Sequence, residues 1–215
     1  MARRPKQLLV EGPEDLYAVV GLMKHHVSWP DDPSARPVHI EQMGGINKIL
    51  DRTYLGTKFK ESGLEVLGVM IDADDNPLSR WQSFQQICAA EFPSLPNDLP
   101  SEGLIAKGRS GLRLGFWLMP DCRSSGMIET FLRHMVPLSE ADLWAHAVDS
   151  FNGARTLGAS CRQAHHDKAH IHTWLAWQDP PGERAGGALT RRILDPAAPT
   201  AQPFVKWFKN LFMLL

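Results

Sequence analysis

The sequence predicts a layered α/β fold in which a mostly parallel sheet is flanked by helices. Continuous apolar runs, above all residues 66–71, are typical of strands buried on both faces. These runs alternate with segments of helical periodicity, the pattern of βαβ units. Acidic residues follow the runs directly, where open α/β sheets carry functional groups. The 215 residues, 43% of them hydrophobic, suffice to bury one compact core.

The first half of the chain predicts three strands and three helices. Residues 8–10 form a short strand, and Pro13 suits the first turn of a helix that ends near residue 26. A proline-rich loop over 29–36 precedes a second strand over 38–43. Asn47 is predicted to cap the next helix, which continues through Tyr54. The strand over 66–71 and a helix over 78–92 complete this half.

The second half predicts a hairpin and then helices. Its strands cover 104–106 and 112–119, and its helices cover 127–135, 138–148, 171–177 and the apolar tail 204–215. Residues 1–180 are therefore expected to form the α/β domain, and residues 181–215 a helical C-terminal extension. Two alternatives stay open for this extension: its apolar side packs on the domain, or it packs on a second subunit and forms a homo-oligomer.

The composition limits which partners and which cellular compartment are expected for the protein. The formal charge of −1 gives no overall attraction for nucleic acid, so such binding needs local patches or a metal ion. Three scattered cysteines without a CxxC motif predict free thiols in a reducing compartment. No run approaches the ~20 apolar residues of a membrane span, and the first run is too short for a signal peptide. We expect a cytoplasmic protein without membrane contact.

Carboxylates gather after two of the predicted strands. Glu11 follows the first strand, while Asp72 and Asp74 follow residues 66–71. Alternate residues of an extended segment face the same way, so both aspartates can face one ion. Crowded carboxylates repel one another unless a cation joins them, and hard divalent ions prefer oxygen ligands. The sequence predicts a Mg²⁺ or Mn²⁺ site, with solvated acids at helix starts as the alternative.

These motifs resemble the Toprim domain, an α/β metal-binding module. Its pattern is a strand-end Glu-Gly and a later Asp-x-Asp, here Glu11-Gly12 and Asp72-Ala73-Asp74. The Glu11–Asp15 stretch resembles the E-G-x-x-D opening of nuclease-type Toprims such as the OLD family. Gly126–Glu129 resembles their later Gly-x-x-Glu element, and Lys168 lies where they place a catalytic lysine. Residues 6–180 thus resemble a standalone Toprim protein of an uncharacterised bacterial family related to those nucleases.

The resemblance implies a Toprim-like (Rossmann-like) fold and hydrolysis of phosphodiester bonds in DNA or RNA with Mg²⁺ or Mn²⁺. It implies Glu11, Asp72 and Asp74 as the main metal ligands, Asp15 and Glu129 as ligands of a second ion, and Glu11 and Lys168 as catalytic residues. OLD nucleases carry an ATPase domain, yet this chain has no G-x-x-x-x-G-K-[ST] loop. A partner ATPase, within a defence system, would therefore be a separate chain.

Other interpretations stay open beside the nuclease. The acidic site is also compatible with a non-hydrolytic module that binds metal together with nucleic acid or a partner protein. An aspartyl phosphatase or phosphate-receiver domain is disfavoured, because a leading Glu-Gly is not its signature. Phosphate contacts are predicted for Lys107, Arg109 and Arg113, with ordinary exposed hairpin charges as the alternative. Asp121 is interpreted as a loop cap, and the histidines at 165, 166, 170 and 172 as solvated residues rather than a zinc site.

Overall fold

The computed structural model describes residues 4–215, so the first three residues of the predicted domain lie outside it. Its centre is a five-stranded sheet, and four of these strands run parallel. β4 is antiparallel to β5, which confirms the predicted hairpin. The order across the sheet is β2 (His39–Gln42), β1 (Lys6–Val10), β3 (Val66–Asp72), β5 (Arg113–Met119) and β4 (Leu104–Lys107). The α/β prediction with a mostly parallel sheet is confirmed.

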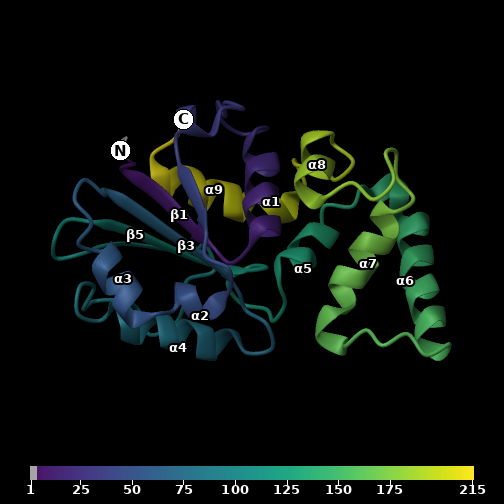
Figure 1. Cartoon of the computed structure of the whole chain (residues 1–215), viewed down its shortest axis with the longest axis horizontal. Coiled ribbons are helices and arrows are strands. Elements are labelled where there is room, and N and C mark those ends of the chain that lie inside the picture. Colours follow the sequence, from purple (N-terminus) through teal and green to yellow (C-terminus); the bar gives the residue numbers. More distant parts are fainter. Residues whose placement is uncertain (1–3) are drawn as a thin grey trace.

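Helices cover both faces of the sheet (Figure 1). One face carries α1 (Pro13–Met23) and α9 (Gln202–Phe212), and the other carries α2 (Ile46–Ile49), α3 (Arg52–Lys58) and α4 (Pro77–Cys88). The remaining helices are α5 (Ile128–Arg133), α6 (Ala141–Thr156), α7 (His166–Leu175) and α8 (Ala185–Thr190). Short 3₁₀ turns cover Pro33–Ala35, Leu138–Glu140, Gln163–His165 and Pro199–Ala201. The α6–α7 pair extends beyond α5, away from the sheet (Figure 1).

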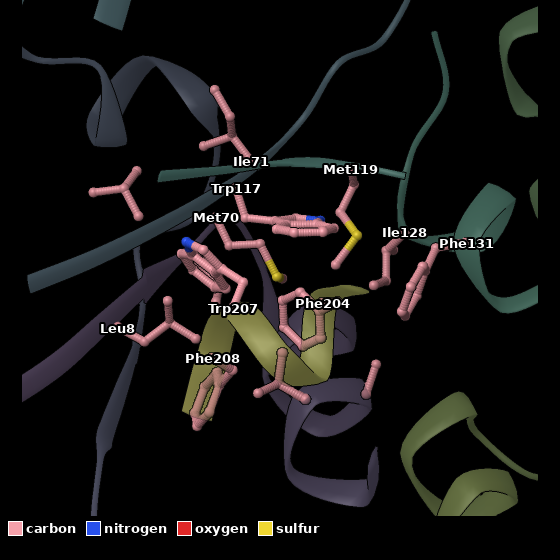
Figure 2. Packing of buried hydrophobic residues seen from close by; sticks show 14 of the residues in the cluster. Leu8, Met70, Ile71, Trp117, Met119, Ile128, Phe131, Phe204, Trp207 and Phe208 are labelled. Atoms are coloured by element: carbon pink, nitrogen blue, oxygen red, sulfur yellow. The ribbon is translucent and has the colours of Figure 1, made fainter. Parts of the chain in front are cut away.

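The C-terminal helix packs on the sheet of its own chain. Figure 2 shows Phe204 and Trp207 of α9 beside Trp117 of β5, with Phe208 further along the same helix. The Trp117 ring lies 5.3 Å from Phe204 and 5.5 Å from Trp207, measured between centroids, in the tilted and edge-on arrangements that aromatic pairs favour. All four side chains are buried. Of the two alternatives for the predicted extension, the structure shows packing on the core.

Several local predictions differ from the structure. Asn47 does not cap a helix, because Gly44 and Gly45 adopt positive φ angles and start the single turn α2. Asp51 instead caps α3, accepting a hydrogen bond from Tyr54 N at 2.7 Å. α6 begins at Ala141 rather than at residue 138. No local pattern predicted α8, which packs against α1.

Two further observations concern membrane-spanning helices and the pairing of the cysteines. Among residues 4–215, no helix combines the length and the apolar content needed to cross a membrane. Cys88 and Cys122 are buried free thiols, and Cys161 is a half-buried one. The structure thus agrees with the prediction that the cysteines are not paired.

Candidate functional site

The carboxyl ends of the parallel strands meet at one edge of the sheet and bring the first two predicted ligands together. Glu11 directly follows β1, and Asp72 is the last residue of β3. The Glu11 Oε1 atom accepts a hydrogen bond from Asp72 N at 2.9 Å. Burial raises the pKa of Glu11, the Asp72 N–H partly opposes this, and the charge of Asp74 raises it further. Glu11 and Asp72 therefore belong to one site.

Asp72 lies at the centre of this site. Its Oδ1 atom accepts a hydrogen bond from Ile128 N at 2.9 Å, which fixes the start of α5 against the end of β3. Burial holds the pKa of Asp72 well above its ordinary value, and the charges of Asp15, Glu11 and Glu129 add to the effect. Carboxylates that follow β1 or belong to α1 and α5 thus act together on Asp72 at the end of β3.

Asp15 is a first-turn acid that points inward. Only 6% of it is exposed, although acids in this position usually complement the helix dipole from the solvent. Its Oδ2 atom accepts a hydrogen bond from Gly12 N at 2.9 Å. Burial raises the pKa of Asp15 to about 7, the Gly12 N–H partly opposes this, and the charges of Glu11 and Glu129 raise it. The orientation of α1 thus adds Asp15 to the site.

Asp74 lies on the rim of the site. Its backbone adopts a left-handed conformation, with φ at 49°, and exchanges two 2.8 Å hydrogen bonds with Gly126. Its carboxylate forms an ion pair with Arg80 of α4. Asp75, the next residue, is exposed. The charge of Asp74 raises the pKa values of both Glu11 and Asp72.

Glu129 brings the predicted catalytic lysine to the same place. This glutamate is 4% exposed, and its Oε1 atom lies 2.7 Å from the Lys168 Nζ atom of α7. Burial alone would lower the pKa of Lys168, but its hydrogen bond to Glu129 and the charges of Glu129, Glu14 and Asp72 raise it overall. The structure therefore unites Lys168 with the acidic residues, although about forty residues separate it from α5.

The chemistry of this donor set fits a hard divalent cation. All of the clustered side chains except Lys168 offer carboxylate oxygens, the ligands that Mg²⁺ and Mn²⁺ prefer. The raised pKa values of Glu11, Asp15 and Asp72 reflect burial together with negative charge that the neighbouring cations do not neutralise. Across the described residues, no group of three or more histidine, cysteine, aspartate or glutamate side chains is already arranged around a single point. Oxygens of Glu11, Asp72 and Asp74 instead contact N–H groups or Arg80.

The predicted nucleic-acid contacts lie elsewhere. Arg113 pairs with Val66 at the start of β3, whereas Asp72 at its end pairs with Met119. Six residues at about 3.3 Å each place roughly 20 Å between the two ends of the sheet. Arg113 also donates hydrogen bonds to the carbonyl oxygens of Leu211 and Asn210, at 3.0 and 3.1 Å. Lys107, Arg109 and Arg113 are therefore not part of the acidic site, and their contact with phosphate stays a prediction.

Sequence reasoning missed the polar contacts that hold α7 on α5. Asp167 accepts hydrogen bonds from Thr130 Oγ1 at 2.7 Å and from Arg133 Nη1 at 2.9 Å. In the sequence, only the position of Asp167 next to Lys168 indicated a role for it, since Thr130 and Arg133 are more than thirty residues away. Asp121 behaves as the predicted loop cap and accepts hydrogen bonds from Arg123 N and Ser124 N.

Comparison with known proteins extends over nearly the whole chain. The model of a family described as "Protein of unknown function (DUF3226)" matches residues 5–213. No curated protein and no solved structure matches the sequence.

Proposed function

We propose that this chain, which belongs to the DUF3226 family of proteins of unknown function, is a Mg²⁺- or Mn²⁺-dependent nuclease. The observation that carries the proposal is the convergence of Glu11, Asp15, Asp72 and Glu129 with Lys168 at one edge of the sheet. Buried oxygen donors beside a lysine suit phosphodiester hydrolysis, in which negative charge develops on phosphoryl oxygens. The resemblance of the same residues to nuclease-type Toprims supports the assignment.

Each residue has a role in this proposal. Glu11, Asp72 and Asp74 would hold the principal metal ion, with Asp15 and Glu129 reaching a second. When bound, the metal would supply Lewis-acid activation of water and neutralise charge on the phosphate. Arg80 pairs with Asp74 at the rim and would compete with the metal ion for that carboxylate.

Lys168 is suited to contact the substrate. Its side chain is 46% exposed, while its ion pair with Glu129 holds the ammonium group at the acidic site. An ammonium group in this place would stabilise the charge that develops on the phosphoryl oxygens. Glu11 lies close enough to Asp72 to share the same substrate atoms and would act as the second catalytic residue.

We further propose a cytoplasmic setting and a separate partner ATPase that gates cleavage within a defence system. The free cysteines support the first, and the resemblance to the OLD family supports the second. The cytoplasmic setting and the partner ATPase both depend on the nuclease assignment, and neither assigns a further residue to the acidic site.

The proposal is tested by incubating the protein with labelled single- or double-stranded DNA or RNA in Mg²⁺, Mn²⁺ or EDTA and measuring cleavage. Cleavage should require a divalent ion, and Asp72→Asn or Glu11→Gln should lower the rate at least about 100-fold. Both substitutions keep the oxygen that accepts the backbone N–H, so the fold should persist, as circular dichroism would check.

Asp75→Asn is the matched control, because Asp75 is an exposed acid in the same segment and should be dispensable. Absence of cleavage with every ion, also after addition of partner proteins from the same source, would contradict the nuclease. Metal-dependent binding without cleavage would favour the non-hydrolytic module instead.

A further inference from the structure

Four basic or ionisable residues recur along α7 and the 3₁₀ turn that precedes it. Arg162, His165, Lys168 and His172 are all exposed, and we call them the α7 basic face. Their spacing of three, three and four residues places them on one side of the 3₁₀ turn Gln163–His165 and of the helix that continues from it. Ile171, Trp174 and Leu175 form the buried side of the same helix.

The other ionisable residues of α7 point away from this face. The rings of His166 and His170 pack edge-on against Phe151 of α6, with centroids 5.0 and 4.8 Å away. The Asp167 carboxylate accepts hydrogen bonds from Thr130 and Arg133 of α5. This acid is therefore engaged with α5 and does not pair with the α7 basic face.

The α7 basic face is continuous with the acidic site. Lys168 belongs to both, since its Nζ atom lies 2.7 Å from Glu129 while almost half of its side chain remains exposed. From Arg162 to His172 the face extends about 15 Å, at roughly 1.5 Å per residue. A stacked nucleic-acid strand advances about 3.4 Å per nucleotide, so the face matches about four nucleotides.

We propose that the α7 basic face binds the phosphate backbone of the strand that enters the acidic site. Guanidinium, ammonium and imidazole groups donate hydrogen bonds to phosphate oxygens and position a strand without reading its sequence. The inference rests on the proposed nuclease function and replaces Lys107, Arg109 and Arg113 as the backbone contacts of that site. Those three residues lie toward the far end of the sheet, and Arg113 already binds the end of α9.

The test compares two double variants of the full chain. Arg162→Ala/His172→Ala removes the two ends of the face and leaves Lys168 in place. Lys60→Ala/Lys206→Ala is the matched control, because it removes at least as much positive charge from exposed residues to which no role in binding is assigned. The affinity for a fluorescein-labelled 20-nucleotide single strand is measured in EDTA over a series of KCl concentrations.

The Arg162→Ala/His172→Ala variant should weaken binding about tenfold or more at low salt. The slope of log K against log salt should fall by about 0.7 for each lost phosphate contact. In a cleavage assay, KM should rise and kcat should stay within about twofold, since the lost binding is uniform along the reaction. The control should stay within about twofold of the wild type in each measurement.

Equal losses in the two variants would overturn the inference, because they would show a general charge effect. Unchanged binding by Arg162→Ala/His172→Ala would overturn it as well, while metal-dependent cleavage would leave the nuclease standing. If the folded wild type bound and cut no nucleic acid, both proposals would fall together.

Discussion

At the scale of single residues, Asp15 shows how burial beside other carboxylates changes the proton affinity of an acid. Glu11, Asp15 and Asp72 share one edge of the sheet, and burial weakens the hydration of each carboxylate. Groups in this situation retain protons in the absence of a cation. Without a bound cation, the folded protein therefore carries an electrostatic cost that depends on pH.

The sign of that dependence follows from the pKa of Asp15. An unfolded aspartate titrates near pH 4, whereas Asp15 in the folded protein has a pKa of about 7. Between these values the folded state holds the extra proton, so the free energy of unfolding falls as the pH rises. A tenfold difference in proton affinity corresponds to about 1.4 kcal/mol, so the loss amounts to a few kcal/mol above pH 7.

Asp15→Asn should remove this loss, because an asparagine keeps an acceptor for Gly12 N and carries no charge. In EDTA at pH 8 the variant should unfold roughly 3–10 °C above the wild type, and at pH 4 the two should nearly coincide. Saturating Mg²⁺ should narrow the gap at pH 8 by stabilising the wild type. Thermal unfolding followed by circular dichroism measures all three, and an equal gap at both pH values would refute the explanation.

The sequence predicted some of these residues for physical reasons and others only by resemblance. Glu11, Asp72 and Asp74 follow buried apolar strands, and parallel strand ends must meet. The burial of Asp15 depends on the rotation of α1, which no local pattern specifies. The run that contains Lys107 and Arg109 is locally similar to a phosphate-binding patch, but local charge does not reveal at which end of the sheet it lies.

At the scale of elements, the contact between α5 and α7 places the lysine. Thr130 Oγ1 accepts a hydrogen bond from Met127 N at the start of α5 and donates one to Asp167. Arg133 completes the contact from the next turn of α5. Since α6 and α7 extend away from the sheet (Figure 1), this contact positions Lys168 beside Glu129.

Under the proposed nuclease function, Asp167→Ala should reduce cleavage, although the Asp167 carboxylate contacts Thr130 and Arg133 of α5. We expect kcat to fall about tenfold with KM nearly unchanged, because Lys168 would lose its fixed position. Asp167→Asn should retain part of the activity through its remaining oxygen. Asp149→Ala on the exposed side of α6 is the control, and an equal loss there would speak against a positioning role.

The helices also show where local patterns stop being informative. The apolar runs of β1, β3 and β5 are recognisable because both faces are buried. α8 escaped prediction because Gly186 and Gly187 are typical of loops. In the structure a methyl group at Gly186 would collide with the backbone oxygen of Tyr17, so this glycine permits the close contact between α8 and α1. Tertiary packing, rather than helix propensity, selects the residue.

At the scale of the whole molecule, α9 closes the core against the middle of the sheet. Gly68 and Gly115 on adjacent strands leave the space that Leu211 occupies. A methyl group added at Gly115 would collide with the Leu211 side chain, and Leu211 is fully buried. Because Gly115 has no side chain, β5 and α9 can pack this closely.

Gly115→Ala should destabilise the protein by about 1–3 kcal/mol, because Leu211 must move within a close-packed core. Gly153→Ala is the matched substitution, since Gly153 lies in α6 with open space around its Cα. It should instead stabilise the protein by up to about 1 kcal/mol through helix propensity. Urea unfolding measures both changes, and the same sign for both would contradict the packing argument.

The position of α9 also has a consequence for biosynthesis. The sheet is translated as far as Met119, and roughly 80 further residues precede the helix that covers its apolar face. At about 5–20 residues per second, β5 is synthesised some 4–18 s before Trp207 and Phe208, and β3 is synthesised earlier still. During that interval a nascent chain exposes Trp117 and its apolar neighbours. Ribosomes that stall before residue 202 should therefore yield chains that are bound by chaperones or degraded, even though every carboxylate of the acidic site has already been made.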